Sequence, residues 1–127
     1  MGLRPPLAKS ELEVARIVWQ LGGATVRQVA DAMPSDRELD FKTVQTYLRR
    51  LEAKGYVRSR RDGRTNVYTS CVRPHTVVRE VVRDMVDRLF DGRAMPLAQH
   101  LIEDHGLSDE EIDELQAALE KLKEKRQ

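Results

Sequence analysis

The chain has 127 residues and a mass of 14.6 kDa, with 40% hydrophobic and 34% charged residues. This composition excludes a disordered chain, and the length suits one small domain or one domain with an appendage. Its longest uncharged stretch, Ile17 to Val26, is far shorter than the ~20 residues of a bilayer-spanning helix. The first residues contain no apolar segment typical of a secretion signal, so we expect none, and a single cysteine excludes an internal disulfide and a multi-cysteine zinc site. We therefore expect a reduced, cytoplasmic protein without a cofactor.

The net charge of +1 hides an asymmetry along the chain. Residues 1–70 hold 13 basic and 8 acidic residues, whereas residues 71–127 hold 9 and 13. The basic residues are densest in residues 42–64. This segment predicts a local binding site for a polyanion, with an ordinary solvated surface as the alternative.

Three pairs of the form Ser/Thr-x-x-Glu/Gln predict the N-termini of three helices. The pairs are Ser10 and Glu13, Thr25 and Gln28, and Ser108 and Glu111. The pair Gly22-Gly23 is expected to end the first helix and Pro34 the second. A polar loop over residues 34–40 should follow.

A third helix is expected over residues 41–54, with Asp40 as its N-cap and Gly55 as its C-cap. At ~100° per residue it carries one apolar face. That face consists of Val44, Tyr47, Leu48 and Leu51. The opposite face is basic and hydroxylated, as a helix that reads the major groove of DNA requires. Its residues are Lys42, Thr43, Thr46, Arg49 and Arg50.

Two strands, residues 56–61 and 65–70, are predicted by their Tyr, Val and Thr content, with Asp62-Gly63 as a two-residue hairpin turn between them. This hairpin carries Arg60, Arg61 and Arg64 beside the basic helix. It can straddle a DNA backbone or enter a minor groove. The alternative is an exposed hairpin whose arginines prevent edge-to-edge aggregation.

The remaining chain is expected to be helical, with a wide apolar stripe over residues 74–90, a short helix around residues 97–102 and a last helix after Ser108. We expect these helices to pair with a second copy, rather than to fold back on the first domain. The expected interface residues are Val78, Val81, Val82, Met85, Leu89, Leu101, Leu115 and Leu119.

The predicted fold class is mainly α with a small β-hairpin wing. The order of elements is typical of a winged helix-turn-helix domain, here residues 7–73, followed by a helical dimerisation region, residues 74–127. The function predicted from these features is sequence-specific DNA binding. A helical interaction module for an acidic partner and an architectural DNA binder without sequence preference are the alternatives.

Other chemistry has little support in the sequence. His100 and Asp104 have the i, i+4 spacing of a metal pair, but a surface helix end is the more common setting for such residues. Cys71 is expected to be a small, buried or half-buried residue, and Trp19 and Tyr68 are expected to pack in the core. No nucleophile–base pair, phosphate loop or carboxylate pair is evident, so we expect neither an enzyme nor a metal site.

Several stretches, taken in order and spacing from about Leu7 to Lys123, resemble the penicillinase-repressor (BlaI/MecI) family of bacterial regulators. The stretches are residues 17–19, residues 25–29, residues 42–51 with Lys54-Gly55, Gly63-Arg64 with Val67-Tyr68, and residues 106–115. The resemblance implies a homodimeric transcriptional repressor on an inverted-repeat operator. It also implies that the third helix lies in the major groove and the wing lies on the backbone.

The resemblance further implies a membrane-embedded sensor protease system as a partner that triggers cleavage of the repressor. Family members are cleaved at an Asn-Phe bond, where this chain has His100-Leu101. Copper-responsive relatives end in Cys-x-Cys motifs, which this chain lacks. The chain thus departs from its relatives at the positions that govern release from DNA.

Overall fold

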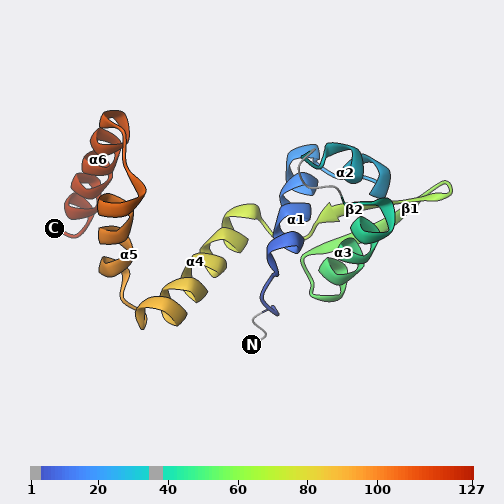
Figure 1. The fold of residues 1–127 in the computed structure, drawn as a ribbon, viewed down its shortest axis with the longest axis horizontal. Helices are drawn as coiled ribbons and strands as arrows, with labels where there is room; N and C mark the ends of the chain where they lie inside the picture. The colour runs from blue at the N-terminus through green and yellow to red at the C-terminus, as the bar shows by residue number, and fades with distance from the viewer. Residues whose placement is uncertain (1–3, 35–38) are drawn as a thin grey trace. The chain divides into compact units, whose positions relative to one another are not determined.

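The structure is a computed structural model that describes residues 4–34 and 39–127 (Figure 1). It divides into two compact units, residues 1–82 and 83–127. Residues 35–38 of the expected polar loop lie outside the described residues. The expected division between a DNA-binding and a dimerisation region at residue 73 concerns function, and it stays a prediction.

The first unit is a three-helix core with a β-hairpin wing, as expected (Figure 1). Its elements are α1 (Lys9–Leu21), α2 (Val26–Ala32), α3 (Phe41–Ala53), β1 (Val57–Asp62), β2 (Thr65–Ser70) and the first turns of α4 (Pro74–Phe90). The two strands are antiparallel neighbours. The fold class predicted from the sequence is therefore confirmed.

The core of this unit lies where α1, α2 and α3 meet. Branched aliphatic side chains fill it, and each of the following is at most 1% exposed: Val14, Val18, Val29, Val44, Leu48 and Leu51. The apolar face predicted for α3 is thus buried, with Tyr47 half-buried at its edge. Burial of one face fixes which residues of α3 point to solvent.

The start of α1 differs from the prediction. The N-cap is Ala8 rather than Ser10, and the Ala8 N–H donates to Glu11 Oε1 at 2.8 Å. The helix begins earlier because Glu11, not Glu13, is the buried carboxylate that turns back to the cap. The other two capping boxes are confirmed, since Thr25 and Ser108 each accept from the backbone N–H three residues later.

The turns around the wing are displaced by one residue from their predicted positions. Lys54, not Gly55, caps α3, and Gly55 follows it with a φ of 88°. Asp62 pairs with Thr65 in the ladder, so the hairpin loop is Gly63-Arg64 rather than Asp62-Gly63. The left-handed residue, Gly63, therefore occupies the first central position, where a type II′ hairpin turn places glycine.

A third short segment extends the hairpin on its inner side. Ala24 and Tyr68 exchange backbone hydrogen bonds of 2.9 and 2.8 Å, which forms an isolated antiparallel bridge. This bridge ties the turn between α1 and α2 to β2. The wing is thus anchored to the helical core at its base.

The second unit contains the last turns of α4, then α5 (Ala94–His100), a π-type turn η1 (Leu101–His105) and α6 (Asp109–Lys125). The backbone φ is positive at Asp91 and Gly92, where α4 ends, and at Gly106, before α6. No helix in the described ranges, 4–34 and 39–127, is long and apolar enough to cross a membrane.

Candidate nucleic-acid interface

The first turn of α3 is fixed by its N-cap. Asp40 Oδ1 accepts a hydrogen bond from the Thr43 N–H at 2.8 Å. This bond and a second one from the Thr43 hydroxyl lower the pKa of Asp40. Thr43 is half-buried. Its hydroxyl therefore binds Asp40 within the chain as well as being proposed to contact DNA.

The outer face of α3 is open to solvent, as the helical periodicity predicted. Lys42, Thr46, Arg49 and Arg50 are all exposed. The Thr46 hydroxyl donates to the Lys42 carbonyl at 3.0 Å, so its oxygen remains able to accept a hydrogen bond. The Arg50 guanidinium lies 5.7 Å from the centroid of the Tyr47 ring, a cation–π distance that orders this side chain.

The wing divides its arginines between two faces. Because side chains alternate along a strand, Arg58 and Arg60 lie on one face of β1 and Arg61 lies on the other with Ser59. The Ser59 N–H and hydroxyl both donate to Glu52 Oε2 of α3, at 3.0 and 2.8 Å. The face that carries Arg61 is therefore the face turned toward α3, and Arg64 lies at the tip in the loop.

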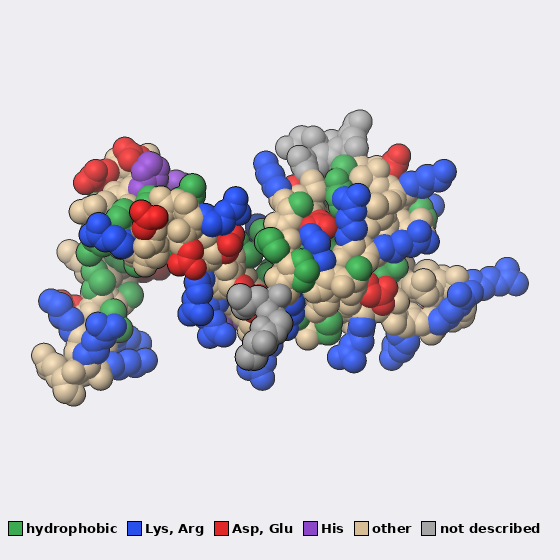
Figure 2. Space-filling model, turned by 90° about the horizontal axis from the view of Figure 1, so that it is seen from below, with side chains coloured by type: hydrophobic (Ala, Val, Ile, Leu, Met, Phe, Trp, Pro, Cys, Tyr) green, Lys and Arg blue, Asp and Glu red, His purple; other side chains and the backbone are tan. Residues whose placement is uncertain are grey.

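The basic residues of α3 and the wing are not neutralised by acidic groups. Figure 2 shows Lys and Arg side chains along the first unit and at the wing tip. Among the described residues, the ion pairs are Arg4–Glu80, Lys54–Glu11, Arg88–Asp84 and His100–Asp104. None includes a basic residue predicted to contact DNA, so this surface retains its positive charge.

A buried ion pair, which sequence reasoning missed, supports α3 from behind. Glu11 of α1 is 2% exposed, and the Lys54 ammonium donates to its Oε1 at 2.6 Å and to the Pro6 carbonyl at 2.9 Å. Burial raises the pKa of Glu11, but the bonds from Lys54 and Ala8 and the charge of Lys54 lower it by more. The pair fixes the C-terminal end of α3 against α1.

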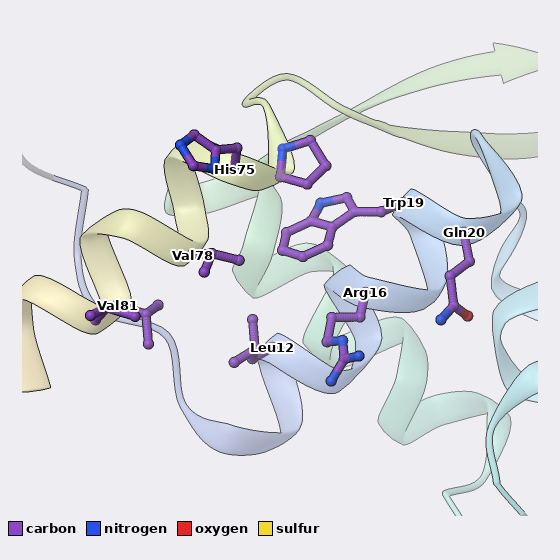
Figure 3. Close-up of a pocket in the computed structure, with 9 residues that line it drawn as sticks. Leu12, Arg16, Trp19, Gln20, His75, Val78 and Val81 are labelled. Atoms are coloured by element: carbon purple, nitrogen blue, oxygen red, sulfur yellow. The ribbon is translucent and has the colours of Figure 1, made fainter. Parts of the chain in front are cut away.

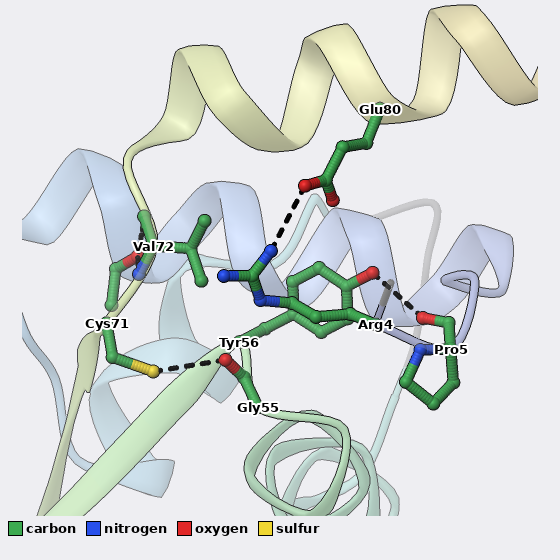
Figure 4. A network of polar contacts seen from close by, with 8 residues as sticks. Arg4, Pro5, Gly55, Tyr56, Cys71, Val72 and Glu80 are labelled. Carbon is green, nitrogen blue, oxygen red and sulfur yellow. Dashed lines mark hydrogen bonds and ion pairs between the residues drawn. The ribbon is translucent and has the colours of Figure 1, made fainter. Parts of the chain in front are cut away.

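A second network connects the N-terminal segment, the start of β1 and α4 (Figure 4). Arg4 pairs with Glu80 at 3.1 Å and lies over the Tyr56 ring, whose hydroxyl donates to the Pro5 carbonyl at 2.8 Å. Burial and the Glu80 charge raise the pKa of Tyr56. The first turns of α4 are thereby fixed to the rest of the first unit.

Three other sequence expectations concern this unit and its neighbour. Cys71 is exposed rather than buried, and its thiol donates to the Gly55 carbonyl at 3.2 Å (Figure 4). Tyr68 is buried as expected, and Trp19 packs half-buried against the core. In the described part of the chain no three potential metal ligands come together, and His100 contacts only Asp104, at 3.1 Å.

The predicted dimer residues are unburied within the single chain. The exposed fractions are 49% for Val78, 38% for Val81, 42% for Val82, 69% for Leu89, 43% for Leu101, 39% for Leu115 and 52% for Leu119. Met85 is half-buried. By contrast Val77, one turn before Val81 on the same helix, is 1% exposed and belongs to the core of the first unit.

Comparison with known proteins identifies the family. The penicillinase repressor family matches residues 7–121. The penicillinase repressor of Bacillus licheniformis is 28% identical over 96% of this chain and 95% of its own length. The methicillin resistance regulatory protein MecI of Mammaliicoccus sciuri is 25% identical over 91% of this chain and 94% of its own length.

Solved structures show the same fold. The DNA-binding domain of the repressor BlaI has a TM-score of 0.51 and 30% identity, and the match covers 58% of this chain and 90% of that domain. A MarR family protein from Bacillus stearothermophilus has a TM-score of 0.54 and 21% identity over 96% of this chain and 76% of its own. This chain belongs to the penicillinase repressor family of winged-helix, DNA-binding transcriptional repressors.

Proposed function

We propose that the chain represses transcription as a homodimer on an inverted-repeat operator, with α3 in the major groove and the wing on the DNA backbone. In α3 the contacts are Lys42, Thr43, Thr46, Arg49 and Arg50. In the wing they are Arg60, Arg61 and Arg64. The observation that carries this proposal is the exposed basic face of α3, which continues into the wing without an acidic partner among the described residues.

This surface has the chemistry of a DNA reader. Arginine forks bind guanine edges and phosphates, and a threonine oxygen contacts a phosphate-bound water or a base edge. The absence of an acid at the centre of the face matters, because a carboxylate there would repel phosphate. A further support is a solved relative: the BlaI monomeric form was determined in complex with the blaP half-operator, at a TM-score of 0.50 and 30% identity.

The second unit supports the dimer. The apolar residues of α6, Ile112, Leu115, Leu119 and Leu122, follow the 3-4-3 spacing of a heptad seam and are 39–52% exposed. A groove of about 380 Å³ between α5, η1 and α6 leaves Leu101, Ile102 and Leu115 accessible. A stripe of this kind is stabilised when a second copy covers it.

The charges on α6 favour an antiparallel pairing with its copy. The first turn carries Asp109, Glu110 and Glu111, whereas the last turn carries Lys123 and Lys125. An antiparallel arrangement places each acidic end beside the basic end of the partner, and a parallel one places like charges together. If the antiparallel pair is centred on residue 117, Leu115 of one copy also packs against residue 119 of the other copy.

The proposal also includes a route for release from DNA, in which a membrane sensor protease triggers cleavage of the repressor. The His100-Leu101 bond lies inside continuous helical backbone, between α5 and η1. A protease needs an extended segment, so this bond must unwind before cleavage. An intact chain mass after induction of the host would exclude this route.

The decisive experiment is fluorescence anisotropy at ~150 mM salt, with the protein titrated into its own upstream promoter DNA and into a scrambled duplex. We expect at least ~1,000-fold preference for the promoter. Equal affinity for both duplexes would identify an architectural binder. No binding to the promoter or to any other genomic fragment would favour the interaction module for an acidic partner.

Three variants test which residues of the interface read bases and which contact the DNA backbone. Arg49→Ala should relax base preference and cost about 1–3 kcal/mol of operator binding. Arg61→Ala should weaken binding to both duplexes and reduce the slope of log affinity against log salt by about 1. Arg60→Ala, on the opposite face of β1, should have the smaller effect, and a larger effect than that of Arg61→Ala would contradict the placement of the wing.

A further inference from the structure

An open, apolar pocket lies between α1 and the first two turns of α4, entirely within the first unit (Figure 3). Its volume is about 520 Å³, inside the ~300–1,000 Å³ range of small-molecule sites. Leu12 and Val78 approach each other across it, and the Trp19 indole forms one wall (Figure 3). The full lining is Leu12, Arg16, Trp19, Gln20, Pro74, His75, Val78, Val81 and Val82.

The polar groups of this pocket are few and carry one sign of charge. Arg16 is exposed and lines the pocket, and no Asp or Glu does. Within the ranges 4–34 and 39–127 the side chains of Arg16, Gln20 and His75 have no hydrogen-bond or ion-pair partner. A guanidinium without an anion therefore stands beside an apolar wall.

We infer that this pocket binds a small carboxylate with an apolar, ring-containing body. The apolar body would lie against Trp19, Leu12 and Val78, where it is removed from water. Its carboxylate would accept paired hydrogen bonds from the Arg16 guanidinium, the geometry for which arginine is suited. Gln20 and His75 supply further donors at the rim.

The site has a consequence for repression, which rests on the proposed function. Val81 and Val82 belong both to the pocket and to the face proposed for the dimer. A ligand that covers these side chains removes them from the dimer face. Ligand binding therefore weakens dimer-dependent operator binding, because two sites that use the same residues are negatively linked.

The test uses the full-length protein and its own fluorescence. Trp19 is the only tryptophan of the sequence, so its emission reports on this pocket alone. We would titrate 3-phenylpropionate, and the uncharged 3-phenylpropionamide as its match, to about 1 mM. The expected result is a saturable change in emission with the acid and at least fivefold weaker binding of the amide.

Two arginine variants complete the test. Arg16→Gln should weaken binding of the acid at least fivefold and leave the amide unchanged, whereas Arg79→Gln, an exposed α4 arginine outside the pocket, should alter neither. Equal binding of acid and amide, or no saturable change, would overturn the inference. So would a shift in emission on dilution alone, which would assign the pocket to a second copy. Because the titration contains no DNA, it fails or succeeds independently of operator binding.

Discussion

At the scale of single residues, Lys54 connects three segments that are distant in the chain. Its ammonium contacts Glu11 in α1 and the Pro6 carbonyl, while its backbone caps α3. Lys54 thus joins the N-terminal segment to the helix proposed to read DNA. Removal of the lysine alone leaves a carboxylate without its main partner in a site that is 2% exposed.

We expect Lys54→Met to lower the free energy of unfolding at about pH 7 by about 2 kcal/mol, since an unpaired buried charge is costly. The figure lies below the range for fully enclosed pairs because the Lys54 side chain is 26% exposed. Urea denaturation measures it. Lys9→Met removes an exposed lysine from the same helix as Glu11 and is the control. Equal stability of the two variants would show that the ion pair contributes nothing.

The same pair makes stability depend on pH. The pKa of Glu11 lies below its ordinary value of 4.5 in the folded protein. The stabilisation is therefore present above the unfolded pKa and is lost as pH falls through the folded one. In Lys54→Met, burial still raises the pKa of Glu11, but the lysine that lowers this pKa is gone. Denaturation in steps from about pH 7 to about pH 3 should show a smaller acid-induced loss in this variant than in the wild type.

At the scale of elements, local signals predicted more than distant contacts did. Two of the three capping boxes, the N-cap of α3 and the bounds of α4 follow from spacing within a few residues. The Ala24–Tyr68 bridge and the Glu11–Lys54 pair join positions more than 40 residues apart. Periodicity identifies a buried face but not the partner that covers it, so those contacts required the structure. Glu11 also overrode the local capping signal at Ser10.

Two of the turns of the first unit that contain left-handed glycines, at Gly23 and at Gly63, differ in what surrounds them. At Gly23 the φ is 117° and an added Cβ would lie 3.0 Å from the Thr69 Cγ2 of β2. At Gly63 the φ is 65° and nothing lies within 4 Å of that position. Gly23 therefore serves both the turn and the close approach of α1 to the wing, whereas Gly63 serves only the turn.

We expect Gly63→Ala to cost about 1 kcal/mol of stability, from backbone conformation alone. Gly23→Ala should cost about 2–3 kcal/mol, because steric crowding against β2 adds to the backbone term. Urea denaturation of both variants provides the comparison, with each serving as the control for the other. If the two costs are equal, the contact with β2 is not a constraint on the wing.

In the whole molecule, the first unit has a buried core, whereas the second unit leaves its apolar residues partly exposed. Six core side chains of α1, α2 and α3 are at most 1% exposed, while the apolar stripe of α6 is 39–52% exposed. Unit 2 also carries opposite charges at the two ends of α6. We infer that the chain folds its DNA-binding unit alone and completes its second unit by association, which the proposed operator symmetry also requires.

The antiparallel pairing of α6 with its copy gives a prediction in which charge is the only variable. Lys125→Glu places like charges beside Glu111 of the partner subunit and should weaken the dimer. Adding Glu111→Lys to the same chain reverses both ends, restores opposite charges and should restore the dimer. Sedimentation equilibrium measures both, and added salt should shrink the difference.

Leu119→Asp is the apolar counterpart, since it sets a carboxylate in the seam and should yield a monomer. Leu119 is 52% exposed in the single chain, so this substitution leaves the fold of the chain intact, which circular dichroism checks. A dimer in Leu119→Asp would move the interface away from α6. Equal dimer strength in the wild type, Lys125→Glu and the double charge reversal would instead indicate a parallel arrangement, because there each end of α6 faces the same end of its copy and like charges oppose one another in all three proteins.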